Sequence, residues 1–174
     1  MQQLGKYSFL CLATSLLAAC GMFATTPSPP EASPAPSYDR VAAIRAAGDR
    51  EQSIIAVNPL RDPGVTLLQD AAKQDEQSGQ YADAAVKLDQ ALMLNPDAPD
   101  LLQERAEVAI RLHDYSNAER FAHKSWSLGP KLGPLCARNW QTVVEMRLQA
   151  RDAAGAETAR KWVGKCHKPG VPRY

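Results

Sequence analysis

Two stretches of this chain repeat one pattern of residues at a spacing of 34 positions, and this period constrains the fold more than any other feature. The matched pairs are Tyr81 with Tyr115, Ala84 with Ala118, and Pro96 with Pro130. A fixed period of this length indicates a supersecondary unit that stacks on its own copies. The chain is therefore expected to be a short array of such units.

The pattern resembles the tetratricopeptide repeat, a helix–turn–helix unit that keeps a small residue where its two helices cross and often ends in proline. The resemblance implies an all-α fold of three hairpins in a short right-handed superhelix, with repeats at 64–97, 98–131 and 134–168. The third repeat matches less well, because Ala156 follows Ala118 by 38 residues rather than 34. It also implies a non-enzymatic scaffold, since such arrays hold proteins or peptides on a concave face.

The N-terminus predicts export and lipid anchoring. Residues 1–19 contain a single charge, Lys6, and an apolar run that is too short to span a bilayer, as in a secretory signal peptide. The run ends in Leu17-Ala18-Ala19-Cys20, which resembles a bacterial lipobox. That resemblance implies cleavage before Cys20 and acylation of Cys20, including palmitate, which anchors the protein stably. With Gly21 following, the expected location is the outer membrane, facing the periplasm.

Three segments outside the repeats are distinguished by composition. Residues 20–37 are rich in proline, serine and threonine and predict an extended tether. Within residues 38–63, a short amphipathic helix is expected first, followed by an extended segment, Ile54–Leu60, rich in β-branched residues. That segment could pack on the first helix, fill the concave groove, or offer an edge to a partner. Residues 169–174 form a C-terminal tail.

The charge balance argues against one class of partner. The whole chain has 20 Lys and Arg against 19 Asp and Glu, a balance that does not favour nucleic-acid binding. Acidic residues nevertheless prevail between positions 39 and 107, and basic residues prevail from 138 onward. This asymmetry could orient a partner, or it could reflect solvated helix faces.

Two cysteines remain once the signal and Cys20 are set aside. Cys136 falls near the start of the third repeat and Cys166 near its end, and these two ends of an antiparallel hairpin are neighbours. An even pair of cysteines in an oxidising compartment predicts a disulfide between them. A reactive thiol pair is the alternative, but the sequence has no Cys-X-X-Cys.

The resemblance also implies which side chains line the concave groove. They are Gln69, Lys73, Glu76, Gln103, Glu107, Ile110, Arg111, Gln141, Glu145 and Leu148. The three glutamines hold the same position in each repeat. They could hydrogen-bond an extended peptide backbone, or they could simply be exposed helix formers.

Nothing in the sequence predicts catalysis, a cofactor or a metal. The three histidines are scattered and match no metal-ligand spacing. The leading hypothesis is a scaffold that binds a protein or peptide partner in assembly of an envelope machine, such as a pilus or secretion system. The alternative is a regulator of cell-wall synthesis that contacts peptidoglycan through the basic C-terminal end, at Arg160, Lys161 and Lys165. A third hypothesis is an enzyme subunit that assists cytochrome or redox maturation.

Overall fold

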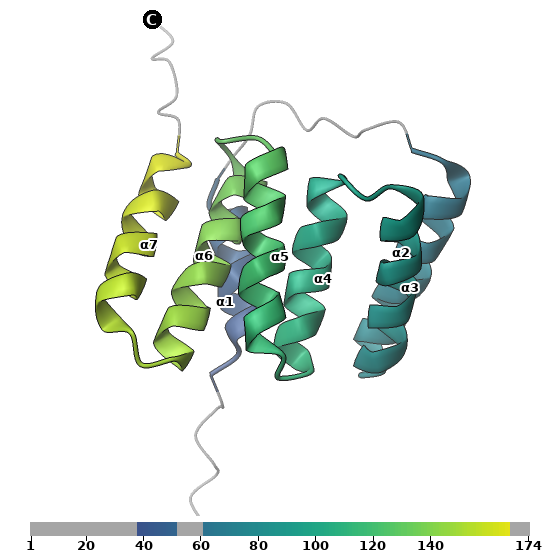
Figure 1. Ribbon diagram of the computed structural model, residues 1–174, viewed down its shortest axis with the longest axis horizontal. Coiled ribbons are helices and arrows are strands. Elements are labelled where there is room, and N and C mark those ends of the chain that lie inside the picture. The colour runs from purple at the N-terminus through teal and green to yellow at the C-terminus, as the bar shows by residue number, and fades with distance from the viewer. Residues whose placement is uncertain (1–37, 52–60, 168–174) are drawn as a thin grey trace, which may run out of the picture. The chain divides into compact units, whose positions relative to one another are not determined.

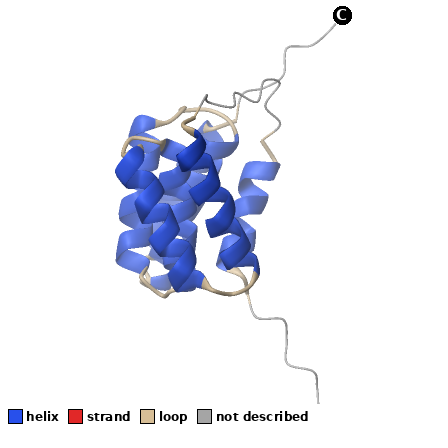
Figure 2. Ribbon diagram, turned by 90° about the vertical axis from the view of Figure 1, so that its right-hand side faces the viewer, coloured by secondary structure: helices blue, strands red, loops and turns tan. Residues whose placement is uncertain are grey.

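The computed structural model describes residues 38–51 and 61–167, and it confirms the all-α expectation for this part of the chain. The helices are α1 (Arg40–Asp49), α2 (Pro63–Gln77), α3 (Tyr81–Leu94), α4 (Pro99–Arg111), α5 (Tyr115–Leu128), α6 (Pro134–Gln149) and α7 (Ala153–Lys165). No strand occurs among the described residues, and short loops join consecutive helices of the hairpins (Figure 2). None of the described helices is long and apolar enough to cross a membrane. The predicted signal, Cys20, the tether, Ile54–Leu60 and the tail lie outside the described residues.

Helices α2 to α7 form three hairpins, α2/α3, α4/α5 and α6/α7, which lie side by side along the array (Figure 1). The first helix of every hairpin begins with a proline, at Pro63, Pro99 and Pro134. Proline suits this position because its fixed φ angle is already helical and its missing N–H would have no partner there. An aspartate side chain accepts a backbone N–H at the start of α5 and of α7, at Asp114 and Asp152.

The turn within each hairpin has one geometry in all three repeats. Gly79, His113 and Arg151 occupy corresponding positions and have positive φ angles of 75°, 61° and 61°. In each case the following residue donates its N–H to a carbonyl oxygen five positions earlier, over 2.8–2.9 Å. This is the glycine-type ending of a helix, although only the first repeat uses glycine. The turns follow one another by 34 and then 38 residues, as the sequence register predicts.

Small residues allow the helices of each hairpin to approach closely. Ala84, Ala118 and Ala156 hold equivalent positions, and each is completely buried. Around them lie apolar clusters that join one hairpin to the next, such as the cluster of Leu88, Leu101 and Val108. The core is therefore continuous along the array, as stacked repeats require.

Helix α1 does not continue the array. It packs mainly against α6 and also touches α4, which are the first helices of the third and second hairpins (Figure 1). Its buried residues are Val41, Ile44, Ala47 and Gly48, which lie on one face of the helix. These helices are the ones that line the concave face in a repeat of this type, so α1 occupies part of the groove.

Candidate functional site

The groove has a covered part, over α4 and α6, and an open part, next to α2. In the covered part the predicted groove residues Gln103, Glu107, Ile110 and Glu145 are at most 6% exposed. Glu107, Ile110 and Glu145 contact α1 or the residues just before it, and Gln103 donates to Glu107 and to Thr142 of α6. The repeat resemblance implies that these residues belong to a partner-binding surface, and in the structure a helix of the same chain occupies that surface.

Charged contacts hold α1 in place at the centre of the covered part. Arg45 of α1 donates to Glu107 over 2.8 Å and to Glu76 of α2 over 2.6 Å. Arg138 of α6 reaches the other oxygen of Glu107 over 2.6 Å. The fully buried Glu107 carboxylate therefore lies between two guanidinium groups, which offsets the free energy lost on removing it from water.

The N-terminal end of α1 is bound through a second group of contacts. The Tyr38 hydroxyl donates to Glu145 over 2.7 Å, and Arg111 donates to Asp39 over 3.0 Å. Arg40 also donates to Gln149. Most of the groove partners named here, Glu76, Glu107, Arg111 and Glu145, are residues that the sequence resemblance had assigned to partner binding.

These contacts change the proton affinities of the groups involved. Desolvation tends to lower the pKa of Arg45, but the Glu107 and Glu76 carboxylates outweigh it and raise that pKa. Desolvation tends to raise the pKa of Asp39, but the Ala42 N–H and Arg111 outweigh it and lower that pKa. Both groups are therefore held in their charged forms, as the ion pairs require.

The open part of the groove is a cavity of about 480 Å³ between α1, α2 and α4. Its lining is Arg45, Asp49, Ala72, Lys73, Glu76, Gln77, Tyr81, Leu88, Glu104, Val108, Arg111 and Arg138. Apolar side chains from α2, α3 and α4 contribute to this lining, together with charges of both signs. Burial raises the pKa of Glu104, whose carboxylate accepts a hydrogen bond from Gln69 over 2.8 Å. Such a surface suits a protein segment that carries both apolar and charged groups.

The row of glutamines is engaged within the fold. Gln69 accepts from Arg61 over 2.6 Å and donates to Glu104, while Gln103 donates to Glu107 over 3.0 Å. Gln141 donates to Glu145 over 2.8 Å. These amides orient buried carboxylates, which makes pairing with an extended peptide backbone less favourable.

The predicted groove residues are therefore brought together only in part. Lys73, Glu76 and Arg111 line the open cavity, and Leu148 is 40% exposed on α6. Sequence reasoning missed Arg45, Asp49 and Glu104 as cavity residues, whereas Arg138 was expected on the concave face and does line the cavity. A signal for α1 was present in the apolar face formed by Val41, Ile44 and Ala47, which needs a surface to cover.

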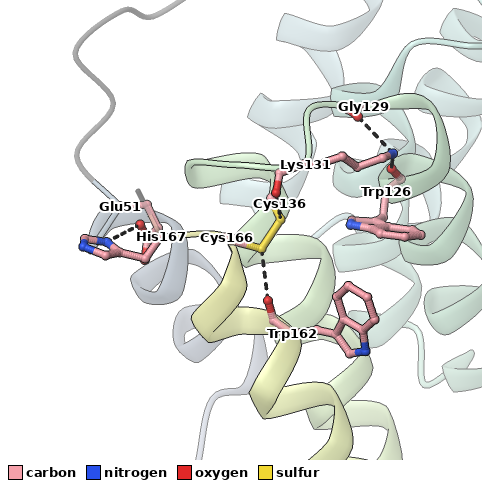
Figure 3. The surroundings of a disulfide bond; sticks show 8 residues. All are labelled: Glu51, Trp126, Gly129, Lys131, Cys136, Trp162, Cys166 and His167. Carbon is pink, nitrogen blue, oxygen red and sulfur yellow. Dashed lines mark hydrogen bonds and ion pairs between the residues drawn. A yellow bond between two sulfur atoms is a disulfide. The ribbon is translucent and has the colours of Figure 1, made fainter. Parts of the chain in front are cut away.

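A disulfide closes the third hairpin next to the C-terminal end of α1 (Figure 3). Cys136 and Cys166 are joined with their Cα atoms 5.6 Å apart, and both are buried. The Gly133 N–H donates to the Cys166 carbonyl over 2.8 Å, and His167 lies 3.0 Å from Glu51 beyond α1. The bond therefore joins the start of α6 to the end of α7, beside the C-terminal end of α1.

Three tryptophans from α5, α6 and α7 pack beside this disulfide. Trp140 stacks on Trp162 with ring centroids 5.1 Å apart, and Trp126 meets Trp140 edge-on at 5.3 Å. Trp126 and Trp162 are drawn in Figure 3. All three are half-buried, and they link the last two hairpins. In the described ranges, no three His, Cys, Asp or Glu side chains converge as metal ligands.

Comparisons with known proteins agree with this architecture. Residues 76–131 match the family model described as tetratricopeptide repeat. Among solved structures, the globular C-terminal domain of LpoP from P. aeruginosa is similar, with 28% sequence identity and a TM-score of 0.57. The match covers 60% of this chain and 99% of that domain. No curated protein matches the sequence. The helical hairpins and the family match together show a fold of the tetratricopeptide-repeat type, which is typical of protein-interaction scaffolds.

Proposed function

We propose that the protein is a lipid-anchored adaptor of the outer membrane, which faces the periplasm and binds a protein partner in its concave groove. The observation that carries the proposal is the open cavity of about 480 Å³ on the concave face, lined by apolar groups and charges of both signs. Repeat arrays of this kind use the concave face for binding. The lipobox-like Leu17–Cys20 and the proline-rich tether support the anchored location. No catalytic step is proposed.

The test is site-specific photo-crosslinking in cells. A photoreactive residue replaces Lys73, which lines the cavity, or Ser127, which is exposed on α5 away from it. We expect a discrete crosslinked partner from position 73 and none from position 127. Equal capture from both positions, or capture only from 127, would move the binding surface off the groove. A Cys20→Ser variant that still reaches the outer membrane would contradict lipid anchoring.

Two finer roles were open, namely assembly of an envelope machine and regulation of cell-wall synthesis. The exposure of Arg160, Lys161 and Lys165 along α7 supports the second of these, because it presents a basic surface at the C-terminal end of the array. The glycan and peptide material of the wall carries carboxylates that such a surface attracts.

Charge reversal distinguishes these roles. Arg160→Glu with Lys161→Glu is compared with Arg120→Glu, a control on the exposed face of α5. Regulation through wall contact predicts that purified sacculi retain the control protein and release the α7 variant. The difference in retention between the two should be larger at low salt, where the attraction is less screened. Equal retention of both variants would exclude the α7 surface as the wall contact and would favour the assembly role.

A further inference from the structure

The covered part of the groove has features of a surface that opens. On the α4–α6 face that α1 covers, Glu107 and Glu145 bind α1 or a residue just before it, and Gln103 and Thr142 bond to each other; all four side chains are at most 1% exposed. A purely structural helix would be held at least as well by an apolar face, because burying charges gains little or nothing over well-packed apolar residues. Polar groups at such an interface keep the exposed groove soluble when the covering helix leaves. One polar atom of this face, Gln103 Oε1, has no hydrogen-bond partner among the described residues.

Helix α1 is suited to dissociate from the groove. Its 10 residues are fewer than an isolated helix needs in water, so its helical form depends on the groove. Its main charged contact is open to solvent on one side, because Arg45 keeps 44% of its side chain exposed although the Glu107 carboxylate that it binds is buried. Ion pairs of this type are weakened by salt and can be exchanged for those of another ligand.

The surface of α4 and α6 that α1 covers, here called its seat, also specifies which segment can replace it. Val41 and Ile44 fill apolar positions with no exposed surface, and Arg45 reaches Glu107. At Gly48 an added Cβ would lie 2.8 Å from Arg138 Cγ and 3.2 Å from the Pro134 carbonyl oxygen, so a larger residue is excluded. The seat therefore fits a helix with apolar residues at positions i and i+3, arginine at i+4, and alanine and glycine at i+6 and i+7.

We propose that the α4–α6 face is a receptor for an α-helix of a partner protein with this pattern, and that α1 occupies the receptor in cis until the partner displaces it. This inference rests on the proposed binding role of the groove and names the chemistry of the partner segment. A helix, rather than an extended strand, is the expected ligand because the groove amides already bind carboxylates of the fold.

The first experiment compares two full-length variants, each with one substitution, at the adjacent positions 46 and 47. Ala47→Asp puts a carboxylate in the seat, where Ala47 is 1% exposed, and Ala46→Asp makes the same change on the solvent side. The probe is a fluorescent peptide of residues 38–51, titrated by anisotropy. We expect the Ala47→Asp protein to bind it at least tenfold more tightly than the wild type or Ala46→Asp, with helical circular dichroism retained.

Peptide variants test the pattern. Peptides with Gly48→Leu or Arg45→Glu should bind the Ala47→Asp protein at least tenfold more weakly than the native peptide. A folded Ala47→Asp protein with no gain in binding, or with equal affinity for all three peptides, would overturn the receptor. If Ala47→Asp fails to fold, full-length Arg45→Glu serves as the releasing variant, and the same outcomes apply.

The second experiment separates this inference from the general function. A photoreactive residue at Ile110, on the floor beneath α1, is compared with one at Lys73 in the open cavity. A partner peptide with the stated pattern, captured from position 110, supports displacement. Capture from position 73 together with only intramolecular links from 110 overturns displacement but leaves the adaptor role intact. Links from position 110 to residues 40–49 of a second copy would show that copies exchange α1, which overturns displacement by a partner protein. The absence of capture from either position would reject both the displacement of α1 and the adaptor role.

Discussion

The disulfide between Cys136 and Cys166 gives the most quantitative prediction. The bond closes a loop with a sequence separation of 30. Chain entropy for a loop of this size predicts that the bond stabilises the fold by about 3.6 kcal/mol. At about 2.1 cal/mol/K per residue, a domain of about 120 residues loses about 0.25 kcal/mol of stability per degree near its melting point, so loss of the bond should lower Tm by about 14 °C.

The effect should be large here because α7 packs chiefly on α6 and ends the array. The assay is urea unfolding of the oxidised and the reduced wild-type protein, followed by circular dichroism. Reduction leaves both sulfur atoms in the core, so the comparison excludes the cavity that substitution would create. A Cys136→Ala, Cys166→Ala double variant is the control, since its stability should not respond to reductant.

A stability difference below about 1 kcal/mol between the oxidised and reduced forms would refute this reasoning. It would mean that packing around Trp162 and Val163 keeps the hairpin closed without the bond, or that the reduced unfolded chain retains structure. An equal response of the double variant to reductant would show that the change does not come from this bond.

Three further predictions concern packing, backbone conformation and titration. Ala84→Leu should destabilise the protein by about 1–3 kcal/mol because the site has no exposed surface, whereas Ala82→Leu on the solvent side should be nearly neutral in the same urea assay. Arg151→Gly should raise the unfolding free energy by about 1 kcal/mol, because Arg151 has a φ of 61°; an unchanged or lower value would exclude strain at this turn. Desolvation and the hydrogen bond to Glu145 raise the pKa of Tyr38 to about 12, so its contribution to stability is complete below pH 10 and is lost between pH 10 and 12. Tyr38→Phe should remove that part of the decline in stability, and it should remove the highest-pH step from the absorbance titration of the tyrosines.

The sequence alone was sufficient for the repeat architecture. A spacing of 34 residues, alanine at the helix crossings and glycine or proline at the helix ends all depend on local geometry, which each repeat expresses separately. The shift to 38 before the third repeat could likewise be detected, because Ala156 and the turn at Arg151 keep their local roles. The cysteine pairing followed from the same register.

The location of α1 could not be predicted in this way. Its apolar face was visible in Val41, Ile44 and Ala47, but an apolar face specifies only that a surface is needed, not which one. The surface it covers carries Glu107 and Glu145, which in sequence are indistinguishable from solvent-exposed groove residues. The burial of Glu107 is offset by Arg45, which is 62 positions away, and by Arg138 from a third helix, whereas Glu145 accepts a hydrogen bond from Tyr38.

Local periodicity, repeated along the chain, thus determined the helices and their order, because those preferences act over a few residues. Only the tertiary structure decided which part of the groove remains open, because that depends on how one short helix outside the repeats pairs its charges and its small residues with α4 and α6. Its occupation of the groove depends on buried carboxylates and on the arginines that reach them from other helices, and a one-dimensional pattern does not contain those pairings.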